Sequence, residues 1–148
     1  MGTRRTAREL ALQALYQLEL VGEAGLLPFD AFCAHFQVSR KAMDYAGTLF
    51  AGVREKMAEI DRLISKHAQN WRLERMSVVD RTILRIAVFE LAFRDDVPAS
   101  VVINEAVEIA KRFSTDDSGS FINGILDAMT REKGVGPESA TKAAGTEK

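Results

Sequence analysis

The chain is poor in the residues that cross-link, bind metals or carry catalysis. It has one cysteine, Cys33, and two histidines, His35 and His67, among 148 residues. A single cysteine excludes an internal disulfide and any site with several cysteine ligands, which is typical of a protein from a reducing cytoplasm. The histidines follow no metal-ligand spacing, and the glycines follow no phosphate-binding pattern. We therefore expect no metal, no cofactor and no enzymatic activity.

The chemistry of these few residues is expected to be inert. Cys33 lies within an aromatic stripe of residues 29–36, so a buried, unreactive thiol is the expected state. His67 falls close to the apolar side of its predicted helix, where a packed or boundary histidine is more common than a ligand. Neither residue is a candidate for catalysis.

Long apolar runs and the features of a signal peptide are also missing. No stretch approaches the ~20 apolar residues of a membrane span, and the basic start continues into an amphipathic segment. The 20 basic and 21 acidic side chains leave a net charge of −1, so overall charge favours neither nucleic acid nor membrane. We expect a soluble cytoplasmic protein in which any RNA site is a local patch.

What the sequence does contain is helical periodicity, whereas strand-like alternation is nearly absent. Apolar residues recur at spacings of three and four and predict helices over residues 4–21, 29–36, 39–67, 77–93, 98–113 and 114–129. Short connections between amphipathic helices predict an all-α fold, a single compact domain over residues 1–133. Two packed subdomains are expected to meet near Trp71. Residues 134–148 have the composition of a disordered tail.

Several predicted helix starts carry capping residues. Ser39 is a plausible cap for the long helix over residues 39–67. Ser77, followed three residues later by Asp80, is a variant of the capping box. Ser114 with Asp117 is expected to cap the last helix in the same way. The helix over residues 77–93 is apolar over most of its circumference, so we expect it at the centre of the fold.

The last helix contains a competing signal. The sequence FINGIL resembles a two-residue hairpin turn between apolar runs. The helical spacing continues to Met129, however, and favours one helix. Gly124 then costs this helix about 1 kcal/mol relative to alanine. Its presence indicates either a close backbone approach or a binding surface.

The first eight residues contain Arg4, Arg5 and Arg8 and no acid. At about 100° per residue the three side chains fall within a quarter turn of the helix, and Tyr16 follows off the apolar face. Arginines pair with phosphates and flat rings stack on unpaired bases, so this arrangement suits single-stranded RNA. On the residues alone, a solvated helix start with a boundary tyrosine explains the same pattern and is favoured.

Charged residues on the helix over residues 98–113 have a simple interpretation. Glu105 and Glu108 precede Lys111 and Arg112 on the same helix. Solvated salt bridges within that helix are sufficient to explain these four side chains.

Three segments resemble one bacterial family, in order, along nearly the whole chain. They are Arg4 to Leu20 (RRTARELALQALYQLEL), Met76 to Leu91 (MSVVDRTILRIAVFEL) and Pro98 to Met129 (PASVVINEAVEIAKRFSTDDSGSFINGILDAM). The family is NusB, whose members are transcription antitermination factors. The resemblance implies seven helices, with three in an N-terminal bundle and four in a C-terminal bundle.

The resemblance implies a non-catalytic RNA-binding factor. NusB-like proteins bind the boxA element of ribosomal RNA leaders together with NusE, a small-subunit ribosomal protein. Through that complex, RNA polymerase is modified to pass terminators while it transcribes ribosomal operons. Asp80 and Asp117 align with the surface that receives NusE, although the helix dipole alone explains acids at two helix starts. The residues that align with the RNA-binding surface are Arg4, Arg5, Arg8, Gln13, Tyr16, Phe121 and Asn123.

Two positions leave room for a rival interpretation. From its spacing, Phe121 is as easily a core residue as a ring that is free to stack. Many relatives carry a lysine immediately before this phenylalanine, whereas this chain has Ser120. One phosphate contact is therefore expected to be missing. The missing lysine and the net charge near zero favour a rival, a NusB-like interaction module or homodimer that does not bind RNA by itself.

Overall fold

The protein, a computed structural model, is described over residues 2–25, 27–68 and 72–132. These residues form seven α-helices, a 3₁₀ turn at Leu73–Arg75 and no strand, which confirms the predicted all-α fold. Trp71 and the predicted tail of residues 134–148 lie outside the described residues. No described helix is long and apolar enough to span a membrane. The helices are α1 (Thr3–Gly25), α2 (Phe29–Cys33), α3 (Arg40–Glu55), α4 (Met57–His67), α5 (Val78–Phe93), α6 (Ala99–Phe113) and α7 (Asp116–Arg131).

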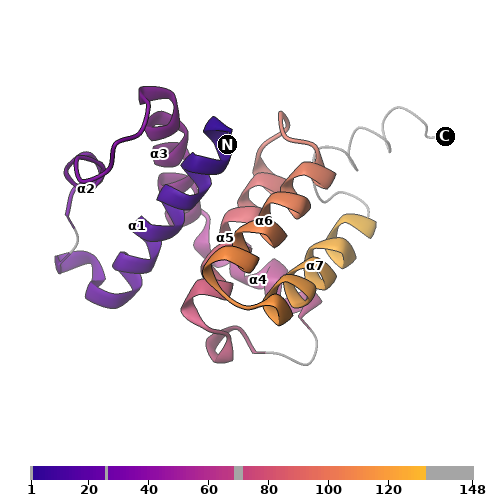
Figure 1. The fold of residues 1–148 in the computed structure, drawn as a ribbon. Coiled ribbons are helices and arrows are strands. Elements are labelled where there is room, and N and C mark those ends of the chain that lie inside the picture. The colour runs from indigo at the N-terminus through magenta and orange to yellow at the C-terminus, as the bar shows by residue number, and fades with distance from the viewer. Residues whose placement is uncertain (1, 26, 69–71, 133–148) are drawn as a thin grey trace.

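The helices form two groups around α5. α1 packs on α3 and carries α2, while α4, α6 and α7 surround α5 (Figure 1). α5 also contacts α1 and α3, so it joins the two groups. This arrangement confirms the expected bundles of three and four helices.

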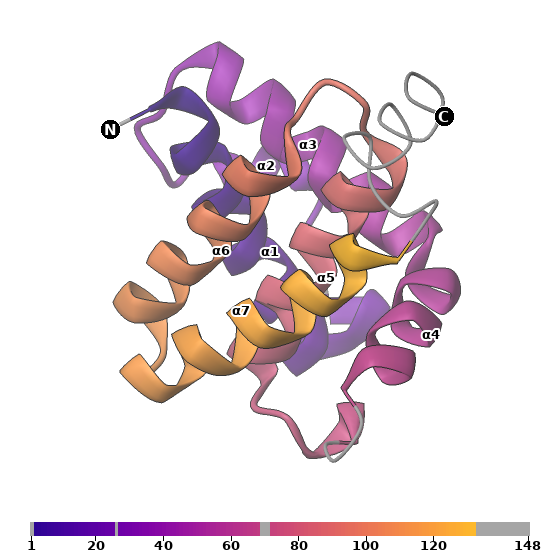
Figure 2. The ribbon, with the colours of Figure 1, turned by 90° about the vertical axis from the view of Figure 1, so that its right-hand side faces the viewer.

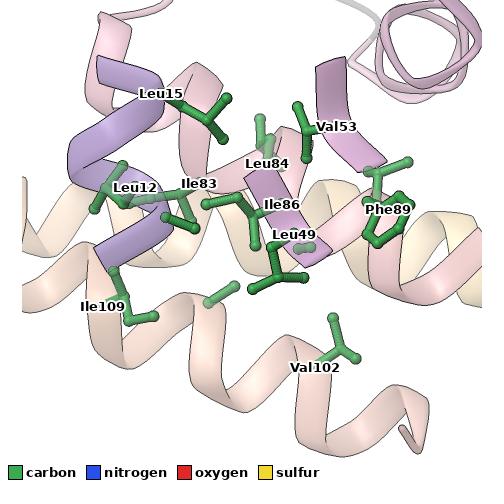
Figure 3. Packing of buried hydrophobic residues seen from close by; sticks show 14 of the residues in the cluster. Leu12, Leu15, Leu49, Val53, Ile83, Leu84, Ile86, Phe89, Val102 and Ile109 are labelled. Atoms are coloured by element: carbon green, nitrogen blue, oxygen red, sulfur yellow. The ribbon is translucent and has the colours of Figure 1, made fainter. Parts of the chain in front are cut away.

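The core is centred on α5, as its nearly continuous apolar circumference predicts. Leu84, Val88 and Leu91 of α5 are completely buried. Burying one such side chain stabilises the fold by about 1.5–3 kcal/mol relative to leaving it exposed. Figure 3 shows side chains of four helices meeting in this core, among them Leu12 and Leu15 of α1, Leu49 and Val53 of α3, Ile83, Leu84, Ile86 and Phe89 of α5, and Val102 and Ile109 of α6.

The prediction of one helix over residues 39–67 is wrong, because the chain turns at Lys56 (φ −103°, ψ 15°). α3 lies against α1, whereas α4 packs on α5 and α7, so the chain must change direction between the two groups. The buried stripe stays in helical phase across the turn, from Val53 to Ile60, and this hides the break from a periodicity analysis. The helix predicted over residues 4–21 extends to Gly25, with a kink at Gly22, whose φ is +74°.

Two of the three predicted caps are confirmed. The side-chain oxygens of Ser39 and Ser77 each accept a hydrogen bond from the backbone N–H three residues later. The cap of α7 is Thr115 instead of Ser114, and its Oγ1 accepts from the Ser118 backbone N–H at 3.1 Å. Ser114 cannot start α7 because its own N–H still donates to the last turn of α6. The competing hairpin at residues 121–126 is absent, since α7 is continuous there.

Two helical glycines differ in what surrounds them. A Cβ built at Gly52 on α3 would lie 2.2 Å from the Phe89 ring of α5. Glycine is therefore what lets these two helices approach so closely. A Cβ built at Gly124 on α7 would meet nothing within 4 Å. A close backbone approach does not explain Gly124, and the second expected reason, a binding surface, stays a prediction.

Alanine at these two glycines should have opposite effects. Gly52→Ala should lower the free energy of unfolding by about 1–3 kcal/mol, because the new methyl group overpacks the contact with Phe89. Gly124→Ala should raise it by about 0.5–1 kcal/mol, because alanine loses less conformational freedom in a helix. Urea denaturation of both variants measures this difference. Equal stabilities would contradict the close contact between α3 and α5.

Candidate nucleic-acid interface

Arg8 lies in the interior, although it falls within the same quarter turn of α1 as Arg4 and Arg5. Its side chain is 4% exposed. Arg8 Nε and Nη2 donate to the two carboxylate oxygens of Glu90 on α5 at 2.8 and 2.9 Å. The Tyr45 hydroxyl of α3 donates to the same carboxylate. One buried cluster thus joins α1, α3 and α5.

The charges of this cluster depend on one another. Burial opposes the charge of the Arg8 guanidinium most strongly, but the hydrogen bonds to Glu90 and the nearby negative charges together outweigh it and raise the pKa of Arg8 above the ordinary value. Burial and the neighbouring Glu90 carboxylate also raise the pKa of Tyr45, which keeps its hydroxyl protonated and donating. Removing either charge would leave the other buried without compensation.

Arg4 and Arg5 reach the surface and pair with acids of the second group. Arg5 Nε and Nη2 each donate to Glu105 of α6 at 2.7 Å. Arg4 Nη2 donates to Asp96, in the loop between α5 and α6, at 3.0 Å. The Arg4 and Asp96 side chains are each 44% exposed. The start of α1 is therefore basic in sequence but largely neutralised by its neighbours.

The predicted salt bridges within α6 are largely replaced by bridges to α1. Glu105 turns toward α1, as described above, and Arg112 donates to Glu9 of α1 at 3.1 Å. Glu108 keeps its predicted partner Lys111, with 3.6 Å between the charged atoms. Helical spacing predicts only partners within one helix. In the fold, Glu105 and Arg112 of α6 lie close enough to side chains of α1 to pair with them instead.

Arg94 shares the acid Asp96 with Arg4, although the sequence did not indicate such a role. Its Nε and Nη2 donate to Asp96 at 3.1 and 3.0 Å. The guanidinium groups of Arg4 and Arg94 lie 4.1 and 5.1 Å from the centre of the Tyr45 ring. The sequence does contain a hint of this role, because the polar residues Arg94 to Asp96 follow directly after an apolar helix. That helix was considered only as part of the core.

Gln13 and Tyr16 lie further along α1, at a largely apolar groove of about 570 Å³. Phe32 of α2 and Phe113 of α6 help to line it. The Tyr16 side chain is 39% exposed, so its ring is accessible for stacking. This position agrees with the prediction that Tyr16 lies off the apolar face of α1.

Phe121 and Asn123 lie on different sides of α7, because two positions on a helix differ by about 200°. Phe121 is half-buried and packs against the core, so it is intermediate between the two expected states. Asn123 is exposed and lines a second groove of about 570 Å³ with Asn104 and Lys111 of α6. Figure 2 shows α6 and α7 side by side.

The two predicted NusE-facing acids lie close together where the starts of α5 and α7 meet. Asp80 Oδ2 accepts a hydrogen bond from Ser118 Oγ at 2.9 Å, and the adjacent Asp117 is exposed. The other Asp80 oxygen, Oδ1, is buried and has no hydrogen-bond partner among the described residues. Asp80 therefore joins two helices, whereas Asp117 is open to a partner.

Cys33 and His67, which the sequence excluded as catalytic residues, are both packed against other parts of the fold. Cys33 is buried, and burial together with the nearby Asp30 charge raises the pKa of its thiol. His67 Nδ1 lies 3.0 Å from the carbonyl oxygen of Leu63, one turn earlier. Within the part of the chain that the structure describes, no group of histidines, cysteines and acids is suited to hold a metal ion.

Comparison with known proteins identifies one family. The model of the NusB family matches residues 5–131. The "Transcription antitermination protein NusB" of Desulfotalea psychrophila is 52% identical over 135 residues, which cover 87% of this chain and 96% of that protein. The protein of the same name from Myxococcus xanthus is 47% identical, covering 87% of this chain and 95% of its own.

Solved structures of NusB proteins are also similar to this chain. A structure of T. maritima NusB is 39% identical with a TM-score of 0.77, covering 89% of this chain and 92% of that one. A structure of the antitermination factors NusB and NusE in complex with dsRNA contains a chain that is 30% identical, with a TM-score of 0.74. That likeness covers 86% of this chain and 96% of the other.

Substitution of Arg8 tests whether it is structural. Arg8→Met should lower the free energy of unfolding by about 3–5 kcal/mol, because the Glu90 charge is left buried and unpaired. A second substitution, Glu90→Leu, should recover most of that loss, since it removes the stranded charge. Urea denaturation of the single and double variants measures both effects. A single variant as stable as the wild type would show that Arg8 is not held in the interior.

Proposed function

The chain belongs to the NusB family of transcription antitermination factors, and on this premise we propose that it binds boxA-type single-stranded RNA together with NusE. The complex acts on RNA polymerase so that transcription of ribosomal RNA operons continues past terminators. The protein is a non-catalytic factor. The observation that carries the proposal is the pair of guanidinium groups at the start of α1, the exposed Arg4 and the partly exposed Arg5, which the loop before α6 and α6 itself hold in place. The similarity to a NusB chain solved with NusE and dsRNA supports both partners.

Arg4 and Arg5 are the proposed phosphate-binding residues. The Arg5–Glu105 pair is partly buried, whereas the Arg4–Asp96 pair is exposed and contributes only about 0.2–1 kcal/mol. An RNA phosphate, which accepts the same forked hydrogen bonds, can therefore replace a carboxylate at little cost. For Arg8 we propose a positioning role, because its side chain is 4% exposed and paired with Glu90 beneath the start of α1.

Aromatic and amide side chains complete the proposed RNA surface. Tyr16 offers its exposed ring to an unpaired base, with Gln13 beside it in the same groove. Asn123 offers both hydrogen-bond donors and acceptors in the groove between α6 and α7. The half-buried Phe121 contributes the part of its ring that the core leaves accessible. Lys111 lines the same groove as Ser120, so that groove retains a cation.

The junction of α5 and α7 is the proposed NusE surface. Asp117 is exposed beside this junction and is available to a basic partner. Asp80 supports it from below, because its carboxylate accepts from Ser118 at the first turn of α7. A charge at the rim of an interface acts mainly on the partner that faces it. Asp117 is therefore expected to affect NusE binding more than RNA binding.

Self-association is the second candidate, and exposed apolar residues favour it. Leu20 is 62% exposed, and Val21 and Tyr16 beside it are also exposed at the groove of α1. A second copy that covered this groove would remove Tyr16 from RNA. In that case the isolated protein would be a dimer that does not bind RNA by itself.

RNA titration with and without NusE tests the proposed function. Arg4→Ala and Arg5→Ala should each weaken boxA binding and flatten its dependence on salt, because each removes one phosphate contact. Tyr16→Ala should cost about 1–3 kcal/mol of binding with an unchanged salt slope, because stacking releases no counterions. Arg40→Ala is the matched control, since Arg40 is an exposed arginine paired with Asp44 on α3.

Three outcomes separate the candidates. Wild-type affinity in the Arg4/Arg5 double variant would refute the proposed RNA site. Binding that appears only with NusE would assign the affinity to the assembled pair. Sedimentation as a dimer, together with RNA binding only after Leu20→Glu, would support self-association.

A further inference from the structure

Asp96 holds two arginines at once. Its Oδ2 accepts from Arg4 and from Arg94, both at 3.0 Å, and its Oδ1 accepts from Arg94 at 3.1 Å. Both guanidinium groups lie over the Tyr45 ring. A single carboxylate thus lies between two cations that come from α1 and from the end of α5. The arrangement is an anion site that an acid of the same chain already fills.

The buried side of this site is held in place by hydrogen bonds, and its outer side is exposed to solvent. Tyr45 is buried, and its hydroxyl is fixed by the hydrogen bond to Glu90. Arg94 is partly exposed, and Arg4 and Asp96 are more so. An incoming anion can therefore displace Asp96 without disturbing the buried cluster. Planar guanidinium groups bind phosphate oxygens with the same forked geometry as carboxylate oxygens.

Asp96 remains charged under all ordinary conditions. Its hydrogen bond from Arg94 lowers its pKa well below the usual range, and this effect outweighs the opposing effect of burial. The carboxylate is therefore a permanent competitor for the two arginines. Any anion that binds Arg4 must either displace it or bind beside a like charge.

We propose that Arg94 is a further RNA-binding residue and that Asp96 occupies, in the free protein, the place of an RNA phosphate between Arg94 and Arg4. This inference rests on the proposed function and extends the same site. On binding, a phosphodiester group replaces the carboxylate, and the freed Asp96 takes up a cation from solution. The ion pairs of the free protein are exchanged for ion pairs with RNA.

The internal anion favours selective binding. A polyanion that interacts through charge alone gains little binding free energy at this site. Each phosphate contact there replaces an existing ion pair. RNA that also stacks on Tyr16 or contacts the protein partner gains enough to displace Asp96. A protein with a net charge of −1 can in this way carry an arginine site and still avoid unspecific nucleic acids.

The experiment compares this site with a matched ion pair at the other end of α1. Arg54 also pairs with an acid, Glu23, and its guanidinium lies 5.1 Å from the Phe50 ring centre, the distance at which Arg94 lies from Tyr45. The test variants are Asp96→Asn and Arg94→Gln, and the controls are Glu23→Gln and Arg54→Gln. BoxA RNA is titrated against each full-length variant with NusE at several salt concentrations, and thermal melting is recorded alongside.

Asp96→Asn should tighten RNA binding by about 2- to 5-fold, because RNA no longer displaces an ion pair. Its salt slope should steepen by up to about 0.7, since no freed carboxylate takes up a cation. Arg94→Gln should weaken binding by roughly 10-fold, as expected for a lost charged hydrogen bond. Its salt slope should flatten by about 0.7, since one phosphate contact is lost. Both controls should stay within about 2-fold of the wild type, because they change the same charges far from the RNA site.

The outcomes distinguish this inference from the function on which it rests. Unchanged affinity and salt slope in Asp96→Asn and Arg94→Gln, with normal binding by the wild type, overturn the inference alone. No RNA binding by the wild type in the presence of NusE overturns both. If Asp96→Asn melts far below the wild type, the Arg94→Gln titration decides, because that variant keeps the Asp96 carboxylate and its bond from Arg4.

Discussion

The buried charge of Glu90 is the constraint on which the rest of the structure depends. Glu90 is 1% exposed on the central helix, and a carboxylate in that position must be paired. Arg8 of α1 and Tyr45 of α3 provide the partners. Because these partners come from the N-terminal group, the contact fixes how that group docks on α5. It also fixes the rotation of α1 about its axis.

That rotation sets the role of each arginine at the start of α1. With Arg8 directed at α5, Arg4 lies one turn earlier and emerges beside Asp96, and Arg5 emerges beside Glu105. The three arginines form a series from the interior to the surface. Breaking the innermost pair, Arg8–Glu90, would strand a buried charge, so it is structural; Arg5–Glu105 is partly buried, and Arg4–Asp96 is exposed enough to exchange with an external anion. The basic helix start thereby lies at the surface without an excess of positive charge, as the proposed RNA site requires.

Sequence periodicity predicted the fold well because burial repeats at helical spacing along each segment. It predicted the central position of α5 and the caps Ser39 and Ser77. It missed the turn at Lys56, since the buried stripe keeps its phase there. The pairing of Arg8 with Glu90 was also beyond it, because the two residues are 82 positions apart and a helical wheel does not show which side faces a neighbouring helix. Resemblance to the family supplied the candidate residues, and tertiary contacts then showed that Arg8 among them is buried.

The most direct test is to observe the arginines themselves by nuclear magnetic resonance, following each Nε–H signal as boxA RNA and NusE are added. The account predicts that the Arg8 signal exchanges slowly with solvent and keeps its chemical shift, because its donors remain on Glu90. The Arg4 and Arg5 signals should shift as phosphates replace their acids. An Arg8 signal that exchanges rapidly in the free protein, or shifts with RNA as far as those of Arg4 and Arg5, would contradict the account.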